Sequence, residues 1–489
     1  MNAPLRRVAV ACMVLFGLLL VNVNYLQVVK GSAYRDDPRN GRVLLRTYEQ
    51  QRGAIALGTG GGRQALARSV ATGDRLKYLR TYPGGPVYAH ATGFFSLVYS
   101  STGIERAEDR ILSGEGDELF TRRLSDYVTG REPKGGSVVL TLQQKAQQAG
   151  YDALGGRKGA VVALDPKTGA ILALVSRPSF DPATLSSHDP AAIRAAYKRL
   201  SGDPDEPLLD RALNQTYPPG STFKVVTSAA ALTSGTVDSP QTVVPAPKEL
   251  LLPQTTRPLR NFGGETCDPS GKQPLINAFA ISCNTAYAQL GLDVGQDALR
   301  KQAEAFGFGQ ADLEVPLSTA TSVFPADVNK PQLGQSAIGQ FDVRVTPLQM
   351  AMVAAGVANG GDVMKPYLVR EVQAPDLSRL DVAKPEVLSS AVSGDVAKQL
   401  TEMMEAVVER GTGGNAKIDG VRVAGKTGTA QNATGKAPHA WFIGFAPAED
   451  PQVAVAVIVE NGGSAGSEAT GGAVAAPVAR AVMQAVLGR

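Results

Sequence analysis

Two residues in the stretch "STFKVVTSAAAL" have the types and spacing needed for covalent acyl transfer. Ser221 and Lys224 stand three apart where a helix is predicted to begin, so both lie on one helix face. The positive end of a helix stabilises a developing alkoxide, and an adjacent amine can accept the proton of a serine. Ser221 is equally a good N-cap residue, so the pair alone does not specify a function.

Two further groups follow along the chain. Ser282 and Asn284 flank Cys283 at the start of another predicted helix, in "AISCNTAYAQLG". The third group, residues 426–429 with the sequence KTGT, lies on a predicted strand. Each group alone has an ordinary explanation, a helix cap for the second and a strand end with a glycine bulge for the third. Together, S-x-x-K, S-x-N and K-T-G in this order are the motifs of penicillin-interacting serine enzymes.

A nucleotide site competes for the third group, because residues 420–427 (GVRVAGKT) also satisfy the phosphate-loop pattern G-x-x-x-x-G-K-[ST]. A phosphate loop runs from a strand through a flexible turn into a helix. Here the residues between the glycines alternate like a strand, and the sequence after them is a poor helix. This context argues against a nucleotide as ligand and favours the acyl-transfer interpretation.

The N-terminus predicts a membrane anchor. Arg6 and Arg7 precede an apolar run over residues 8–21, and no small-x-small cleavage site follows it. We therefore expect residues 1–30 to form a cytoplasmic stub and an uncleaved, single-pass span in the plasma membrane, rather than a cleaved signal peptide. Positive residues stay in the cytoplasm, so everything after about Lys30 is expected to be extracytoplasmic.

Composition excludes several other classes of protein. The 489 residues carry a net charge of only +4 with no dense basic block, which argues against nucleic acid as a partner. An exported location also argues against ATP or GTP, which are cytosolic. We expect no metal and no cofactor.

The pattern of elements predicts a mixed α/β fold of the α+β type. Residues 31–136 are expected to form a small extracytoplasmic N-terminal domain that serves as a pedestal or docks partners, and residues 137–489 the catalytic domain. Two early apolar strands (GAVVALD, AILALVS) and three late ones (VRVAGKTGT, AWFIGFAP, VAVAVIVEN) predict a five-stranded antiparallel sheet flanked by helices, with a helical lobe inserted between the two sets.

The three cysteines fall into two groups. Cys12 lies in the apolar run, where we expect a buried thiol. Cys267 and Cys283 lie in the part expected outside the cell, where thiols oxidise readily. A disulfide between them is favoured over two free thiols, although their spacing does not establish it.

Nearly the whole chain resembles the class B penicillin-binding proteins. Beyond the three motifs, the resemblance rests on QRGAI at residues 51–55, VVALDPKTGAILALVSRPSFDP, TPLQMAMVAAGVANGG and VAGKTGTAQ. Within that family these segments are most similar to an actinobacterial branch. The resemblance implies a D,D-transpeptidase that cross-links peptidoglycan stem peptides ending in D-Ala-D-Ala, is acylated by β-lactam antibiotics, and joins cell-wall synthesis and division proteins at the membrane.

The resemblance also implies roles for the motif residues. Ser221 would attack the D-Ala-D-Ala carbonyl, and Lys224 would take its proton as a neutral amine. Lys426 would favour that neutral state, because a nearby cation lowers the pKa of an amine. Ser282 would relay protons toward the leaving amine, and Asn284 would hold the substrate amide and orient Lys224.

The strand motif would bind the substrate terminus. A charged Lys426, with Thr427 and Thr429 on one face of the strand, would receive the terminal carboxylate. Gly428 would keep that face open for the substrate backbone. The N–H groups of Ser221 and Thr429 would form the oxyanion hole, typically worth a few kcal/mol per donor.

Three residues depart from the commoner family pattern or offer alternatives. Cys283 stands where related β-lactamases often have Asp, and Phe341 follows Gly339-Gln340 where relatives often have glycine. Neither change predicts lost activity. His439 follows the third motif, but this mechanism needs no histidine, so a structural or cleft-rim role is favoured.

Other functions remain as alternatives. A β-lactamase needs a water-activating group, and Glu314 in "EVPLS" is a near-match in a turn-like context with Pro316. A membrane-bound β-lactam sensor needs a cytoplasmic output, yet only about seven residues precede the span. An inactive scaffold for wall-synthesis partners is a third possibility. A D,D-carboxypeptidase differs only in whether water or an amine receives the acyl group.

Overall fold

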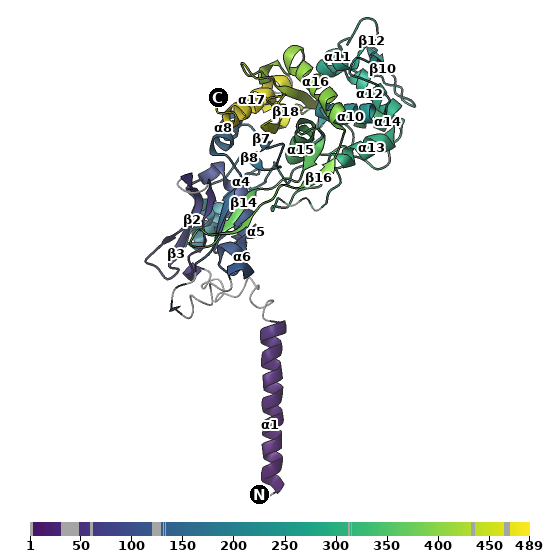
Figure 1. Ribbon diagram of the computed structural model, residues 1–489. Helices are drawn as coiled ribbons and strands as arrows, with labels where there is room; N and C mark the ends of the chain where they lie inside the picture. Colours follow the sequence, from purple (N-terminus) through teal and green to yellow (C-terminus); the bar gives the residue numbers. More distant parts are fainter. Residues whose placement is uncertain are drawn as a thin grey trace.

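The computed structural model describes residues 3–30, 48–58, 62–119, 129–130, 132, 134–311, 313, 315–431, 436–463 and 470–489. The chain forms an N-terminal helix and a folded body with two main sheets (Figure 1). Glu314, which the sequence offered as a water-activating residue, lies outside the described residues.

The N-terminal helix has the length and composition of a membrane span. Helix α1 (Ala3–Asn24) continues into a π-helical turn, η1 (Tyr25–Val29). An 18-residue window within this stretch has a mean hydropathy of 2.1, and none of that window is buried against the rest of the protein. A single apolar helix of 27 residues, exposed on all sides, fits the single-pass anchor that the sequence predicts.

The predicted five-stranded antiparallel sheet is present, in the order β17-β18-β19-β7-β8. Its strands are β7 (Gly159–Leu164), β8 (Ile171–Arg177), β17 (Ala424–Ala430), β18 (His439–Ala446) and β19 (Val453–Val459), and all four pairings are antiparallel. The two early strands lie beside the last one because β7 pairs with β19 along its full length. This arrangement makes β17, which carries the KTGT motif, an edge strand.

Helices cover both faces of this sheet, so its strands are buried on both sides. On one face, α8 (Gln144–Leu154) packs against α17 (Ala476–Val486), and Val455 and Val457 of β19 belong to that core. On the other face, α15 (Pro347–Ala358) contacts β7, β18 and β19. Burial on both faces explains why the strands are almost continuously apolar.

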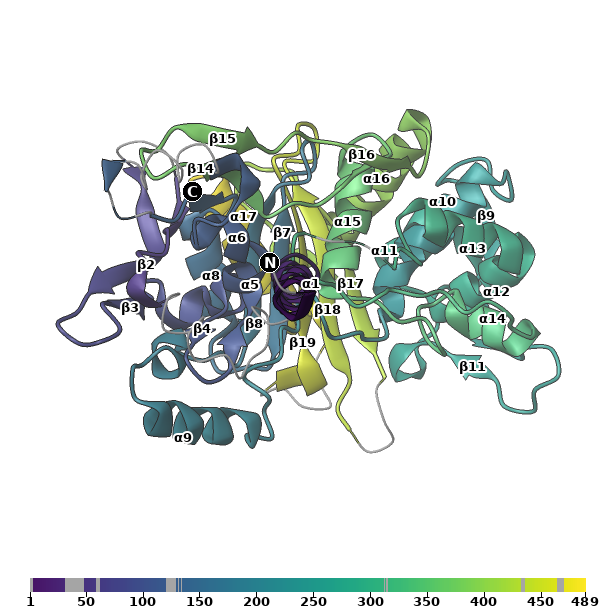
Figure 2. The ribbon, with the colours of Figure 1, turned by 90° about the horizontal axis from the view of Figure 1, so that it is seen from below.

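The helical lobe lies beside the β17 edge (Figure 2). It contains α10 (Lys224–Thr233), α11 (Leu275–Ala280), α12 (Asn284–Val294), α13 (Gln296–Ala305) and α14 (Lys330–Ser336). Helix α16 (Gly394–Arg410) packs on both α11 and β17 and so joins the lobe to the sheet. The junction between sheet and lobe brings together the three motifs, which are far apart in the sequence.

A second, six-stranded sheet was not anticipated from the sequence. Its order is β15-β14-β6-β1-β2-β3, with strands β1 (Ile55–Leu57), β2 (Gln64–Ala71), β3 (Tyr78–Thr81), β6 (Ser137–Leu140), β14 (Val369–Gln373) and β15 (Arg379–Val382). Strand β6 begins at the expected domain boundary, and β14 and β15 come from more than 200 residues later in the chain. The N-terminal region and the catalytic region therefore share this sheet.

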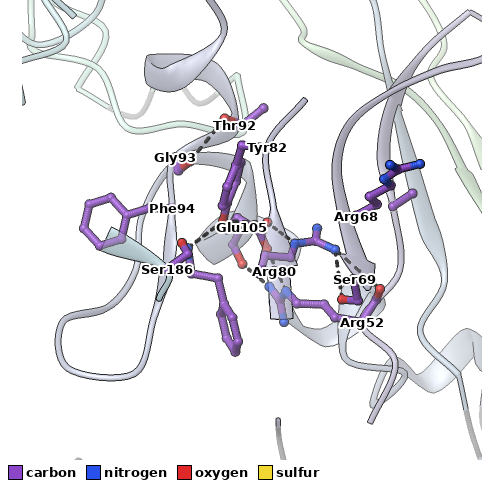
Figure 3. Close-up of polar contacts among 12 residues, drawn as sticks. Arg52, Arg68, Ser69, Arg80, Tyr82, Thr92, Gly93, Phe94, Glu105 and Ser186 are labelled. Carbon is purple, nitrogen blue, oxygen red and sulfur yellow. Dashed lines mark hydrogen bonds and ion pairs between the residues drawn. The ribbon is translucent and has the colours of Figure 1, made fainter. Parts of the chain in front are cut away.

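A buried charge cluster organises the region before β6 (Figure 3). Glu105, on the short helix α5 (Gly103–Ala107), is fully buried and accepts hydrogen bonds from Arg52 Nε and Arg80 Nε, both at 2.6 Å. The Tyr82 hydroxyl also donates to the Glu105 carboxylate, over 3.1 Å. Burial tends to raise the pKa of Glu105, but the two arginines outweigh burial and lower that pKa below its usual value. A carboxylate with three donors satisfies the requirement that buried charges be paired.

Candidate functional site

The first motif forms a tight turn at the start of α10. Residues Gly220–Phe223 make a 3-10 turn (η6) that runs directly into α10, so Ser221 and Lys224 lie on the same face as predicted. Gly220 has φ of 53°, which favours glycine. A Cβ atom at Gly220 would also lie only 2.8 Å from the Thr429 carbonyl oxygen. The Ser221 turn and the KTGT strand therefore approach each other more closely than any side chain at Gly220 would permit.

Two hydrogen bonds, one from the backbone and one from a side chain, link this turn to two other segments. Gly220 N–H donates to Gly339 O at 2.9 Å, and the indole of the buried Trp441 donates from Nε1 to Pro218 O at 3.1 Å. Ser221 itself is partly exposed. Among the described residues its hydroxyl has no hydrogen-bond partner, so the hydroxyl can turn toward a substrate.

The second motif lies at the start of α12 and is capped by a residue that the sequence did not indicate. Asn261 Oδ1 accepts hydrogen bonds from Asn284 N–H at 2.9 Å and from Thr285 N–H at 3.1 Å. Asn261 therefore acts as an N-cap from a distant loop. Its 23-residue separation from Asn284 gives no local pattern that could have revealed this role.

Lys224 is fully buried and bonds to both polar residues of the second motif. Its Nζ lies 2.7 Å from Ser282 O, 2.8 Å from Asn284 Oδ1 and 3.3 Å from Ser282 Oγ. Burial lowers the pKa of Lys224 well below its usual range, and the charge of Lys426 lowers that pKa further. A neutral amine has two N–H groups, which match the two obligate acceptors and leave the lone pair for a hydroxyl proton.

Lys426 approaches the same hydroxyl from β17. Its Nζ lies 2.9 Å from Ser282 Oγ and 3.0 Å from Thr427 O, and its side chain is also fully buried. Burial lowers the pKa of Lys426 to about 7. Burial thus opposes the charged form expected for Lys426 from the sequence, and a bound carboxylate would favour that form.

The remaining residues of the strand motif divide between the two faces of β17. Thr427 and Thr429 line a cavity beside Ser221, as expected from the alternation of side chains along a strand. Gly428 is not part of that lining, and a Cβ atom there would lie 2.9 Å from Pro219 O. The reason proposed for Gly428 therefore changes: it permits close packing against the nucleophile turn.

The cavity unites all three motifs in a volume of about 360 Å³. The lining residues come from the Ser221 turn, the loop around residues 261–267, the Ser282 segment, β17 and two late loops: Ser221, Asn261, Phe262, Glu265, Thr266, Cys267, Ile281, Ser282, Cys283, Asn284, Ile338, Gln340, Thr412, Thr427, Thr429, Thr470, Gly471 and Gly472. A larger cavity of about 740 Å³ lies elsewhere, around His90 and Phe180, and contains none of the motif residues.

Cys267 and Cys283 form a disulfide at the edge of this cavity. The bond ties the 261–267 loop to the middle residue of the second motif. Because the same loop carries Asn261, both covalent and hydrogen bonds fix it to the start of α12.

The structure bears on two further residues singled out in the sequence, His439 as a possible base and Phe341 as a departure from the family pattern. His439 is buried, and its Nδ1 accepts a hydrogen bond from Asn461 N–H at 3.1 Å. Burial lowers the pKa of His439 and so favours its neutral form, which can accept this hydrogen bond from the loop after β19. Phe341 has φ of 60°, the left-handed region that glycine occupies freely. No cluster of potential metal ligands occurs in the described part of the chain.

Comparison with known families gives two matches in this chain. Residues 159–484 match the family described as Penicillin binding protein transpeptidase domain, and residues 52–138 match the Penicillin binding protein A dimerisation domain.

Individual relatives agree with these matches. The chain is 51% identical to the peptidoglycan D,D-transpeptidase PbpA of Mycolicibacterium smegmatis and 50% identical to PbpA of Mycobacterium tuberculosis, over 100% of this chain and 99% of each relative. It superposes on penicillin-binding protein A from M. tuberculosis in its penicillin G acyl-enzyme complex with a TM-score of 0.85 and 48% identity, over 90% of this chain and 100% of that one. These findings confirm both the resemblance and the actinobacterial branch.

Proposed function

The chain belongs to the penicillin-binding protein transpeptidase family and is a peptidoglycan D,D-transpeptidase of class B, and we propose that Ser221 is its nucleophile. The observation that carries this assignment is that Ser221, Ser282 and the threonines of the KTGT strand line one cavity, while the buried Lys224 and Lys426 bond to Ser282 Oγ behind it. β-Lactams acylate the same serine in this account.

The acylation step follows from the hydrogen bonds around Lys224. The Ser221 hydroxyl attacks the carbonyl of the D-Ala-D-Ala bond, and the neutral Lys224 amine takes the proton. The Ser221 and Thr429 N–H groups bind the oxyanion, since both residues line the cavity and the Ser221 turn packs closely against the KTGT strand. Collapse of the tetrahedral intermediate breaks the C–N bond, and the proton passes from Lys224 through Ser282 Oγ to the leaving alanine.

The carboxylate of the substrate has a complementary wall. Thr427 and Thr429 present hydroxyl groups to the cavity, and Lys426 lies behind them within hydrogen-bond distance of Ser282 Oγ. An arriving carboxylate favours the charged form of Lys426 and raises its pKa. Binding of the substrate carboxylate therefore favours protonation of Lys426, which burial opposes in the empty site.

We further propose on which side of the membrane each part of the chain lies and what the N-terminal region does. Arg6 and Arg7 precede the apolar helix, which places the N-terminus in the cytoplasm and the catalytic region outside. The Cys267–Cys283 disulfide supports an oxidising compartment. Residues 31–136, whose strands β1, β2 and β3 join the six-stranded sheet shared with the catalytic region, space the site from the membrane and dock cell-wall synthesis proteins.

Transfer and hydrolysis are distinguished by the products of one reaction. The detergent-solubilised chain is incubated with a stem pentapeptide and an amine acceptor, and the products are measured by mass spectrometry. A cross-linked product is expected together with released D-alanine. Release of D-alanine with only the shortened peptide would identify a carboxypeptidase instead.

A further inference from the structure

One ionisable side chain faces the catalytic cavity without a role in the mechanism above. Among the described lining residues, Glu265 is the one that carries a titratable group exposed to the cavity, since Cys267 and Cys283 are bonded to each other. It lies on the loop that forms the lobe side of the cavity. The hydroxyl-bearing wall of Thr427 and Thr429 belongs to the sheet.

The Glu265 carboxylate is unpaired. Within the described part of the chain its side chain makes no hydrogen bond and no ion pair. The nearby cation in the sequence, Arg260, is already paired with Glu249 at 2.9 Å. Lys224 and Lys426 are fully buried and bond to the second motif. The cavity thus presents a free negative charge to solvent.

The loop that carries Glu265 is fixed at both ends. Asn261 Nδ2 donates to Glu265 O at 3.1 Å, while Asn261 Oδ1 caps α12. Two residues after Glu265, Cys267 is bonded to Cys283 beside Ser282. These bonds fix the backbone at Glu265 and so limit the positions that its exposed carboxylate can take at the cavity.

Apolar side chains lie beside this charge. Phe262 and Ile281 also line the cavity, and they are 60% and 43% exposed. Exposed apolar groups next to a single carboxylate match a ligand with an aliphatic stem and a cationic tip, because such side chains bury the stem and keep the charge in water. A transpeptidase needs an amine as its second substrate.

We propose that Glu265 binds the ammonium group of the acceptor stem peptide, a primary amine at the end of an aliphatic side chain that packs on Phe262 and Ile281. This inference rests on the proposed function. Glu265 recruits the cation to the cavity that holds the Ser221 acyl-enzyme. An exposed ion pair is weak, so the amine still releases a proton to solvent before it reacts.

The reaction that follows balances in atoms and protons. The neutral amine nitrogen attacks the acyl-enzyme carbonyl and forms the new C–N bond. The bond between that carbonyl and Ser221 Oγ breaks, and the second amine proton passes through Lys224 to Ser221 Oγ. The enzyme returns to its starting state with an amide as product.

The test measures how the acyl-enzyme divides between two acceptors. The full chain in detergent is acylated with the thioester donor N-benzoyl-D-alanyl-thioglycolate in the presence of Nα-acetyl-L-lysine amide, and the ratio of aminolysis to hydrolysis is measured at low salt. Both products arise from one acyl-enzyme, so a change in acylation rate cancels. We expect Glu265→Gln to lower the ratio by three- to fivefold and Glu265→Lys to lower it further. The difference should disappear in 1 M salt.

The control variant is Glu304→Gln, which removes an exposed glutamate on α13 outside the cavity lining and should leave the ratio unchanged. An unchanged ratio in both Glu265 variants would overturn the proposal. A second result would also overturn it: Glu265 variants that are acylated more slowly than wild type by donor peptides with a free side-chain amine, but at the wild-type rate by donors whose side-chain amine is acetylated. Glu265 would then recognise the donor peptide rather than the acceptor. A wild-type chain that forms no acyl-enzyme would instead refute the proposed function.

Discussion

Lys224 and Lys426 meet at one hydroxyl, with their Nζ atoms 3.3 and 2.9 Å from Ser282 Oγ. Two amines in one buried cluster cannot both be charged at low cost, and each has a pKa below its usual value. Lys224 adjoins the Ser221 turn and bonds to Asn284 Oδ1, whereas Lys426 lies on the strand of the third motif. This arrangement supports the proposal that Lys224 is the base and Lys426 the cation.

The first prediction concerns the pH dependence of acylation. Lys224 must be neutral, so the rate falls as pH drops through its lowered pKa. Lys426 must be charged to bind a carboxylate, so the rate also falls as pH rises through about 7. The second-order rate constant for acylation by benzylpenicillin should therefore follow a bell-shaped curve.

A matched ligand tests the alkaline side of that curve. The methyl ester of benzylpenicillin lacks the carboxylate, so its slower acylation should show no decline above pH 7. If the acylation rate constants of the acid and the ester fall equally above pH 7, Lys426 does not bind the carboxylate.

The second prediction concerns the disulfide. Cys267 and Cys283 are 16 residues apart, and closing a loop of about that length stabilises a protein by ~3 kcal/mol in the chain-entropy account. The double variant Cys267→Ser/Cys283→Ser should unfold at lower urea concentration and acylate more slowly, because the Asn261 cap is less restrained. The Cys12→Ser variant is the control and should match the wild type. An unchanged urea midpoint and acylation rate in the double variant would contradict this prediction.

The third prediction concerns the buried charge cluster of Figure 3. Glu105→Gln leaves Arg52 and Arg80 without a buried counter-charge, so we expect a loss of about 3–5 kcal/mol in the free energy of unfolding. Asp109→Asn is the matched control. Asp109 also pairs with Arg52, at 2.6 Å, but its side chain is half exposed, so the expected loss is below ~1 kcal/mol.

The same cluster predicts a direction of pH dependence. The folded-state pKa of Glu105 lies below its unfolded value of 4.5. Its contribution to stability is therefore complete above that unfolded pKa and is lost as pH falls below it. Equal urea midpoints for Glu105→Gln and Asp109→Asn would show that the cluster does not act as described.

The fourth prediction concerns Phe341. Its φ of 60° costs a non-glycine residue roughly 1–2 kcal/mol, whereas glycine adds conformational entropy to the unfolded chain. Phe341→Gly should leave the free energy of unfolding within ~1 kcal/mol of wild type. Phe341→Ala keeps the strain and loses the ring, so it should be less stable than the glycine variant. A glycine variant that unfolds at lower urea concentration than the alanine variant would contradict the account of backbone strain at this position.

The sequence predicted the parts that depend on local patterns. The five apolar segments and the i, i+3 spacing of Ser221 and Lys224 are properties of single elements, and they predicted the five-stranded sheet and the shared face of Ser221 and Lys224. The shared six-stranded sheet depends instead on β14 pairing with β6 across more than 200 residues, and no short pattern reports such a pairing.

Three features of the site could not be predicted because they depend on contacts between distant parts of the chain. Asn261 caps α12 from a loop that only the tertiary fold brings near. The lowered pKa of Lys426 reflects burial, which the motif does not reveal. The role of Gly428 depends on the approach of Pro219 from another element.

The measurement that tests the central assignment most directly is the intact mass of the detergent-solubilised chain during reaction with benzylpenicillin, followed by peptide mapping of the adduct. The wild-type chain should gain one covalent benzylpenicillin, located on the peptide that contains Ser221, and Ser221→Ala should gain none. An adduct of the same stoichiometry on Ser221→Ala, or one mapped to another residue, would contradict the assignment of Ser221 as the nucleophile.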